Sequence, residues 1–114
     1  MKAGKVWGET RNIWNSPFSK VDVIRLNAGG YCSEHCHHHM PNWFYVIEGL
    51  LEITVWQTNG LVDKTVLGPG EMTVVPAGLF HSMKAIEATH AIEGYEPVSV
   101  SVADIERRTT GAAR

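Results

Sequence analysis

Long apolar runs are missing from this sequence. No stretch of its 114 residues approaches the ~20 consecutive apolar residues that span a bilayer. Residues 1–7 also lack the apolar segment of a secretory signal peptide. We therefore expect a cytoplasmic protein with no membrane partner. The net charge of −2 provides no strong field for an anionic polymer, so we expect no nucleic-acid partner either.

Cysteine and helix-forming sequence are both scarce. Cys32 and Cys36 are the only cysteines, and in the cytosol we expect both to be free thiols that pack as small apolar groups. The one candidate helix is a short turn over 102–108. Residues 109–114 have the composition of a short flexible tail.

Turn signals, in contrast, are frequent. They recur about every eight to twelve residues, as in 27–30 and at Asn59-Gly60, and β-branched and aromatic runs fill the intervals. This pattern predicts an all-β sandwich or barrel of antiparallel strands with little helix. We expect one domain over 1–114, with core strands over about 20–100 and the N-terminal stretch as an outer strand. The expected strands include 21–26, 44–47, 51–56, 62–67 and 72–75.

Histidine is the unusual abundance, with six residues. His35 and His37 lie two positions apart, so on a regular strand both side chains point to one face. Asn42 opens the next expected strand, and His81 follows the rigid turn over 76–78. An antiparallel barrel can bring these side chains together, and neutral imidazole suits zinc, iron, manganese, nickel and copper. We therefore predict a site for one divalent transition metal on His35, His37, Asn42 and His81.

The same residues also allow simpler interpretations. Any one histidine alone is typical of a surface or a satisfied core position, and Asn42 can instead hold a turn or orient a water. His38 and His39 are expected to be exposed to solvent. Because side chains alternate along a strand, we expect Cys32 and Cys36 to lie on the face away from the metal.

The spacing of these residues resembles a known family. Gly29, His35, His37, Asn42 and Gly49 are similar in spacing to the first motif of the cupin superfamily, and only Asn42 departs, standing where the motif has glutamate. An asparagine oxygen carries no charge, so three histidines and one asparagine leave the +2 of the metal uncancelled. We infer a stronger attraction for anionic ligands than a glutamate site would have.

The second cupin motif is similar to Gly70, the turn over 76–78 and His81, with Ala85 where the motif ends in asparagine. Twenty residues separate Gly49 from Gly70, a spacing within what cupins show. The resemblance implies a double-stranded β-helix, the jelly-roll or cupin barrel, with a metal ion and a small-molecule ligand inside.

A weaker resemblance points to one cupin subgroup. Residues 37–44 are similar to the His-His-His-Arg-x-Glu-x-Trp segment of type II phosphomannose isomerase cupin domains. Met40 and Asn42 replace the arginine and glutamate of that family, and His35 replaces its glutamine ligand. The other segments that carry the resemblance are 6–8 and 103–107.

Three classes of function remain open from the sequence. An enzyme would use the metal as a Lewis acid on a small oxygen-rich substrate, sugar-like or carboxylate, in an isomerisation or epimerisation, or would use iron for dioxygenolytic cleavage. A binding module would use the metal to anchor a small ligand without turnover. A structural barrel would bind metal adventitiously. No general base is evident, because Glu48 lies at a turn and no Tyr, Lys or Asp can be placed beside the metal.

Two further expectations concern the pocket wall and the oligomeric state. Phe44 and Met83 share the strand parity of the predicted ligands, so we take them as candidate substrate-binding residues. Exposed edge strands need cover, which favours a homodimer. The apolar residues available for that contact are Val6, Trp7, Ile13 and Trp14.

Overall fold

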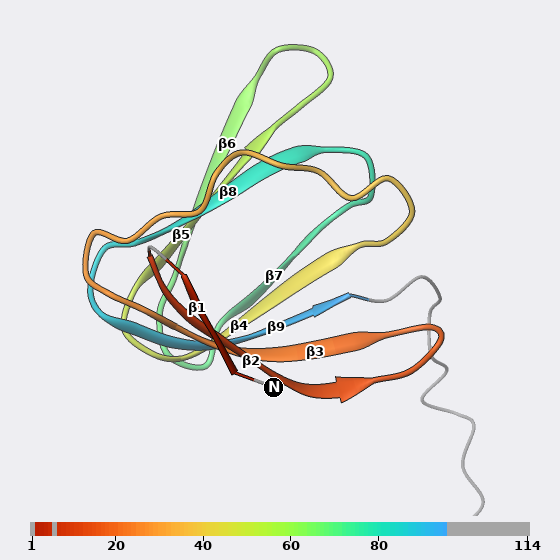
Figure 1. The fold of residues 1–114 in the computed structure, drawn as a ribbon. Coiled ribbons are helices and arrows are strands. Elements are labelled where there is room, and N and C mark those ends of the chain that lie inside the picture. Colours follow the sequence, from red (N-terminus) through yellow and green to blue (C-terminus); the bar gives the residue numbers. More distant parts are fainter. Residues whose placement is uncertain (1, 6, 96–114) are drawn as a thin grey trace, which may run out of the picture.

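Two antiparallel sheets face each other in the computed structural model, which describes residues 2–5 and 7–95 (Figure 1). The large sheet has the strand order β1-β2-β3-β9-β4-β7, and the small sheet has the order β6-β5-β8. This confirms the predicted all-β jelly roll. The strands are β1 Lys2–Lys5, β2 Gly8–Asn15, β3 Lys20–Leu26, β4 Asn42–Glu48, β5 Leu51–Trp56, β6 Val62–Leu67, β7 Met72–Val75, β8 Phe80–Ala85 and β9 Thr89–Tyr95.

The strands expected from composition and turn spacing are confirmed. β5, β6 and β7 have the predicted bounds, β3 begins one residue earlier than predicted, and β4 extends beyond both predicted ends. Within 2–5 and 7–95 there is no helix of the length and apolarity needed to cross a membrane. The candidate helix over 102–108 and the tail over 109–114 lie outside the described residues.

Side chains that alternate along the strands build the core between the two sheets. On β4, for example, Phe44 and Val46 are buried, whereas Tyr45 between them is exposed. Removing such side chains from water stabilises the fold by about 1.5–3 kcal/mol each. The buried apolar residues are Ile24, Leu26, Phe44, Val46, Leu51, Ile53, Leu67, Val75, Met83, Ala85 and Ala91.

The turn between β4 and β5 requires a glycine for two reasons. Gly49 has a φ of +97°, a left-handed conformation that other residues rarely adopt. A Cβ atom there would also lie 2.3 Å from the carbonyl oxygen of Ala88. This turn therefore sends the chain from the large sheet to the small one at close range to the start of β9.

The connection from β3 to β4 passes along the edge of the small sheet. Two isolated bridges, Tyr31 with Lys84 and His35 with His81, attach it to β8. In Figure 1 this connection runs across the molecule opposite β3 and returns to β4 at the end of the barrel. At one edge of the large sheet, β1 pairs with β2.

Candidate functional site

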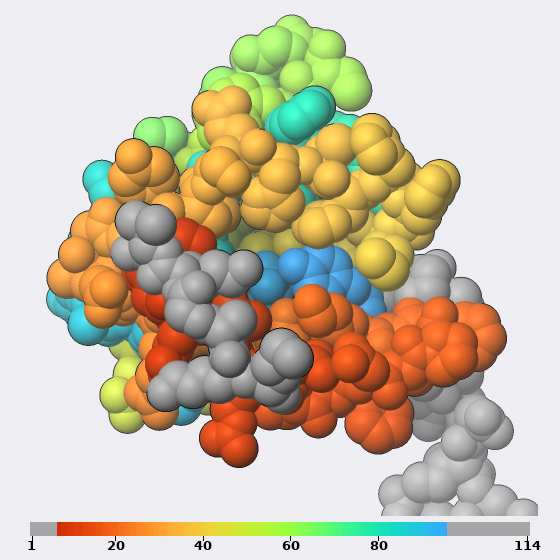
Figure 2. Space-filling view, in the orientation of Figure 1, coloured from red at the N-terminus to blue at the C-terminus, as the bar shows by residue number. Residues whose placement is uncertain are grey.

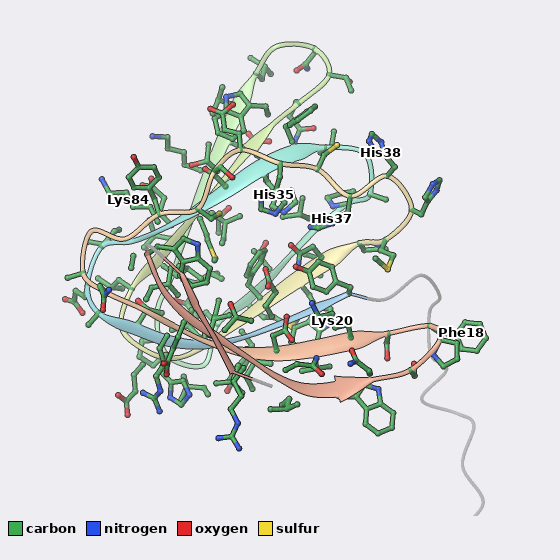
Figure 3. The ribbon with its side chains drawn as sticks, viewed as in Figure 1. Phe18, Lys20, His35, His37, His38 and Lys84 are labelled. Atoms are coloured by element: carbon green, nitrogen blue, oxygen red, sulfur yellow. The ribbon has the colours of Figure 1, made fainter. Side chains whose placement is uncertain are left out.

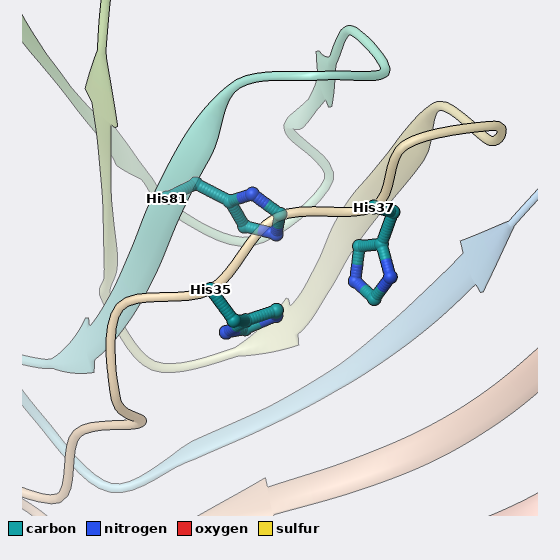
Figure 4. Close-up of side chains that lie close together, drawn as sticks. All are labelled: His35, His37 and His81. Atoms are coloured by element: carbon teal, nitrogen blue, oxygen red, sulfur yellow. The ribbon is translucent and has the colours of Figure 1, made fainter.

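Backbone pairing brings histidines from two distant segments together. The His35 N–H donates to the His81 carbonyl oxygen at 3.0 Å, and the His81 N–H donates to that of His35 at 2.8 Å. The Gly78 N–H donates to the His37 carbonyl oxygen at 2.8 Å, which ties the turn before β8 to the same segment. As a result, the three imidazoles gather in the space between the sheets (Figure 4).

The three rings are in mutual contact. Their centroids are 4.5 Å apart for His35 and His81, 5.1 Å for His35 and His37, and 5.4 Å for His37 and His81. One nitrogen of each ring lies within 4.8 Å of the corresponding nitrogens of the others, so the cluster can hold a metal ion. Two nitrogens that share one ion lie at most about 4.2 Å apart, twice the usual metal–nitrogen distance, so small ring rotations suffice.

Hydrogen bonds to the backbone orient two of the imidazoles in the same way. The Nδ1 of His35 lies 2.9 Å from the Ser33 carbonyl oxygen, and the Nδ1 of His81 lies 3.1 Å from that of Leu79. A carbonyl oxygen only accepts, so each Nδ1 carries the proton and each neutral ring presents the Nε2 lone pair. Histidines that ligate metals are commonly held by this kind of hydrogen bond.

The third imidazole has an unsatisfied nitrogen. The Nε2 of His37 is buried and has no hydrogen-bond partner among the described residues. A buried polar atom without a partner costs free energy, and such atoms are rare in folded proteins. A metal ion among the three rings would give this atom a partner, so the donor set fits a transition metal.

Asn42 lies beside the cluster with its oxygen turned toward it. Its Nδ2 donates to the Gly94 carbonyl oxygen at 3.0 Å, which fixes the amide orientation, and its Oδ1 lies 3.0 Å from the His81 Nε2. Because the His81 Nδ1 donates to Leu79, neutral His81 and Asn42 present two acceptors to each other. A shared cation would make this arrangement favourable.

Burial keeps two of the histidines neutral. It lowers the pKa of His37, and repulsion from the charged forms of His35, His81 and Lys20 lowers that pKa further. Burial likewise lowers the pKa of His81, although its hydrogen bond to Leu79 partly opposes the shift. Neutral rings at physiological pH are the form that binds metal.

A cavity of about 260 Å³ adjoins the cluster at His35. It lies between the connection that follows β3, on one side, and strands β2, β3 and β9 on the other. In Figure 2, atoms of β9 are visible in blue in the hollow between that connection and β2–β3. Pockets for drug-sized ligands measure about 300–1,000 Å³, so this cavity suits a smaller molecule.

The β3–β9 side of the cavity carries polar residues that sequence analysis did not place near the metal: Lys20, Asp22, Glu93 and Tyr95. Asp22 and Glu93 are directly paired across β3 and β9 and are 2% and 8% exposed. The alternation of side chains along β3 could have identified Asp22, because this residue points to the same inward face as Ile24 and Leu26.

These polar residues are coupled to one another. Burial raises the pKa of Glu93, and the charge of Asp22 raises it further, whereas a hydrogen bond with Tyr95 lowers it. Burial and the neighbouring Glu93 strongly raise the pKa of the Tyr95 hydroxyl. Asp22 is held by Lys20 Nζ at 3.3 Å and by Asn12 Nδ2 at 2.9 Å.

The two candidate substrate-binding residues occupy different surroundings. Met83 is buried and lines the cavity together with His35. Phe44 lies in the core, 1% exposed, and its ring stands edge-on to His81 with centroids 6.4 Å apart. His38 and His39 are exposed, as predicted.

The expectation that both cysteines face away from the histidines is wrong for Cys32. Its side chain lines the cavity on the same side as His35, and its Sγ accepts the Met83 N–H at 3.2 Å. The parity rule fails because this segment is not a continuous strand and meets β8 only at the bridges of Tyr31 and His35. Both cysteines are free thiols, as expected.

Comparison with known protein sequences identifies the family of this chain. The family model described as cupin matches residues 18–100, which is more than half of the chain. Germin-like protein subfamily T member 3 of Arabidopsis thaliana is 36% identical over 58 residues, a match covering 51% of this chain and 26% of that protein. The chain therefore spans only about a quarter of that relative's length.

Solved structures share the fold at low sequence identity. Bacillus subtilis oxalate decarboxylase, described with Mn(II) centres, gives a TM-score of 0.77 at 23% identity, covering 91% of this chain and 29% of that one. KdgF from Halomonas sp. gives 0.71 at 20% identity, covering 83% and 84%. The cupin domain of Schizosaccharomyces pombe Cnp3 gives 0.71 at 20%, covering 82% and 67%. These structures share the fold, and the family model over residues 18–100 shows that the chain belongs to the cupin family.

Proposed function

We propose that this cupin holds one divalent transition metal on His35, His37 and His81, with the Asn42 oxygen as a fourth donor, and binds a small oxygen-rich ligand there. The observation that carries the proposal is the buried His37 Nε2, which has no partner among the described residues yet faces two other imidazoles. The Mn(II) centres of the structurally similar oxalate decarboxylase make manganese one of the ions to test.

Different residues of the chain orient the donors and determine the charge at this site. Ser33 and Leu79 hold two imidazoles in one tautomer through their carbonyl oxygens. The amide of Asn42 is neutral, so the positive charge of a bound ion would remain available to attract ligand oxygens. When bound, the ion would supply Lewis acidity toward those oxygens.

The test is zinc binding measured by isothermal titration calorimetry. We expect the native protein to bind one zinc ion, and His37→Ala to bind it about 100-fold or more weakly, because loss of a ligand costs at least as much as loss of an outer hydrogen bond. His38→Ala, which alters the neighbouring exposed histidine, is the matched control and should retain native affinity. Equal affinity of His37→Ala and the native protein would contradict the proposal.

We also infer that two copies of the chain associate through an outer apolar face of the large sheet. The strand registers place large, partly exposed apolar side chains of β2, β4 and β7 on that face, and exposed apolar side chains on one face favour association. This outer apolar face consists of Ile13, Trp14, Tyr45, Met72 and Val74.

A further inference from the structure

The cavity has a polar wall, opposite the histidines, that the proposed metal centre leaves without a role. Glu93 projects inward from β9 and is hydrogen-bonded to the Tyr95 hydroxyl. Asp22 projects inward from β3 beside Glu93. Its carboxylate oxygens accept a hydrogen bond from Asn12 and form an ion pair with Lys20. Figure 3 places Lys20, on β3, across the interior from His35 and His37.

Glu93 retains unused hydrogen-bonding capacity. A carboxylate has about four acceptor positions, whereas within the described part of the chain the hydrogen-bonding partners of Glu93 are the Tyr95 hydroxyl and the Asn42 amide. Two carboxyl groups directly opposite each other on neighbouring strands disfavour folding, and apolar residues there would be at least as stable. Packing alone therefore does not explain an acidic pair at this position, and the pair faces the cavity.

We propose that Glu93 and Tyr95 recognise a hydroxyl group on a ligand whose other end is held by the metal, an inference that rests on the metal centre proposed above. A hydroxyl both donates and accepts, so it can donate to Glu93 while the Tyr95 hydroxyl turns its single proton from Glu93 to the ligand oxygen. A carboxylate at the same place would only accept and would meet the charges of Asp22 and Glu93. The ligand is therefore a small hydroxylated acid or polyol, within a cavity of about 260 Å³.

Two four-carbon probes separate these chemistries. Both 4-hydroxybutanoate and succinate offer one carboxylate to the metal, and they differ only in a hydroxyl or a second carboxylate at the far end. We expect the zinc-loaded protein at pH 7.5 to bind 4-hydroxybutanoate at least about 10-fold more tightly than succinate, since like charges held together cost several kcal/mol. In Glu93→Gln the preference should shrink to about threefold or less, while Glu87→Gln, at an exposed position, should keep it.

Zinc affinity is measured on each variant before the probes are added. If the native protein fails to bind zinc, the proposed function fails and this inference falls with it. If zinc binds but succinate is bound as tightly as 4-hydroxybutanoate, or Glu93→Gln keeps the native preference, the metal centre stands and the role of Glu93 is overturned.

Tyr95→Phe provides a second test, because this substitution removes only one hydroxyl group. Zinc affinity should stay native, and affinity for 4-hydroxybutanoate should fall about fivefold to tenfold because one neutral hydrogen bond is lost. Native affinity for 4-hydroxybutanoate in Tyr95→Phe would show that Tyr95 does not take part in recognition of the ligand hydroxyl. The variant keeps the inference testable if Glu93→Gln folds poorly.

Discussion

At the residue scale, three of the four candidate ligands depend on a neighbour that fixes their orientation. His35 and His81 use the same device, a Nδ1 hydrogen bond to the carbonyl oxygen two residues earlier. Asn42 is oriented by the Gly94 carbonyl oxygen. These contacts are made before any ion arrives, so the donors lose little conformational freedom on binding.

The shifted pKa values at this site predict how the stability of the metal-free protein depends on pH. The pKa values of His37 and His81 are lowered by folding, so their stabilising contribution is present above pH 6.5, the ordinary histidine value, and is lost as the pH falls. The pKa of Glu93 is raised, so its contribution is present at low pH and is lost as the pH rises. The two effects oppose each other.

Glu93→Gln removes the opposing effect. In the presence of a chelator, its free energy of unfolding should therefore rise more steeply between about pH 5 and pH 7.5 than that of the native protein. Urea denaturation at several pH values measures this slope, and Glu87→Gln should reproduce the native one. If the slope in Glu93→Gln is equal to or shallower than the native slope, the raised pKa of Glu93 is contradicted.

At the scale of elements, β9 joins the core to the site. It lies between β3 and β4 in the middle of the large sheet, and its inward positions carry Glu93 and Tyr95. Its outward position Gly94 lies under the Trp43 ring of β4, where a Cβ atom would be 2.1 Å from a ring carbon. The absence of a side chain at Gly94 therefore allows the Trp43 ring to lie against the backbone of β9.

Gly94→Ala should destabilise the protein by about 1–3 kcal/mol, because the added methyl group overlaps a ring that packs against the backbone. Trp43→Ala removes the obstacle, so the double variant should lose less than the sum of the two single losses. Urea denaturation of the four proteins gives the coupling free energy. Strictly additive losses would show that the overlap with Trp43 is not the cause.

At the scale of the whole molecule, the two faces of the large sheet differ in role. The inner face supplies the core and the cavity wall, whereas the outer face exposes Ile13 and Trp14, at 52% and 57%, near the end of β2. Of the residues expected to contact a second copy, Trp7 instead packs against the core and lines the cavity. Val6 lies outside the described residues.

If two copies pair through the outer apolar face, a charge at Trp14 should separate them. We expect the native protein to elute as a dimer in size-exclusion chromatography with light scattering, and Trp14→Asp to elute as a monomer because burying the new charge is costly. Leu61→Asp, at an exposed apolar position between β5 and β6, should remain dimeric. A native monomer at high micromolar concentration would count against the contact.

Local chemistry made much of the fold predictable. Turn residues and alternating β-branched runs are properties of neighbouring positions, so they determined the bounds of β5, β6 and β7 and the all-β class. Strand parity and the resemblance of the glycine and histidine spacing to the cupin motifs selected His35, His37 and His81, which the structure gathers in one cluster. The same local rule failed at Cys32, where the chain leaves regular strand geometry.

The sequence by itself thus determined the fold class, because strand and turn signals are local, and the three histidines that can share an ion, because their spacing resembles that of the two cupin motifs. Only the tertiary structure decided what faces them. Asp22 meets Glu93 through the pairing of β3 with β9, and Tyr95 reaches the His37 ring, 4.8 Å away between centroids, because the two sheets close over one interior. Such contacts depend on strand order, which spacing along the chain does not specify.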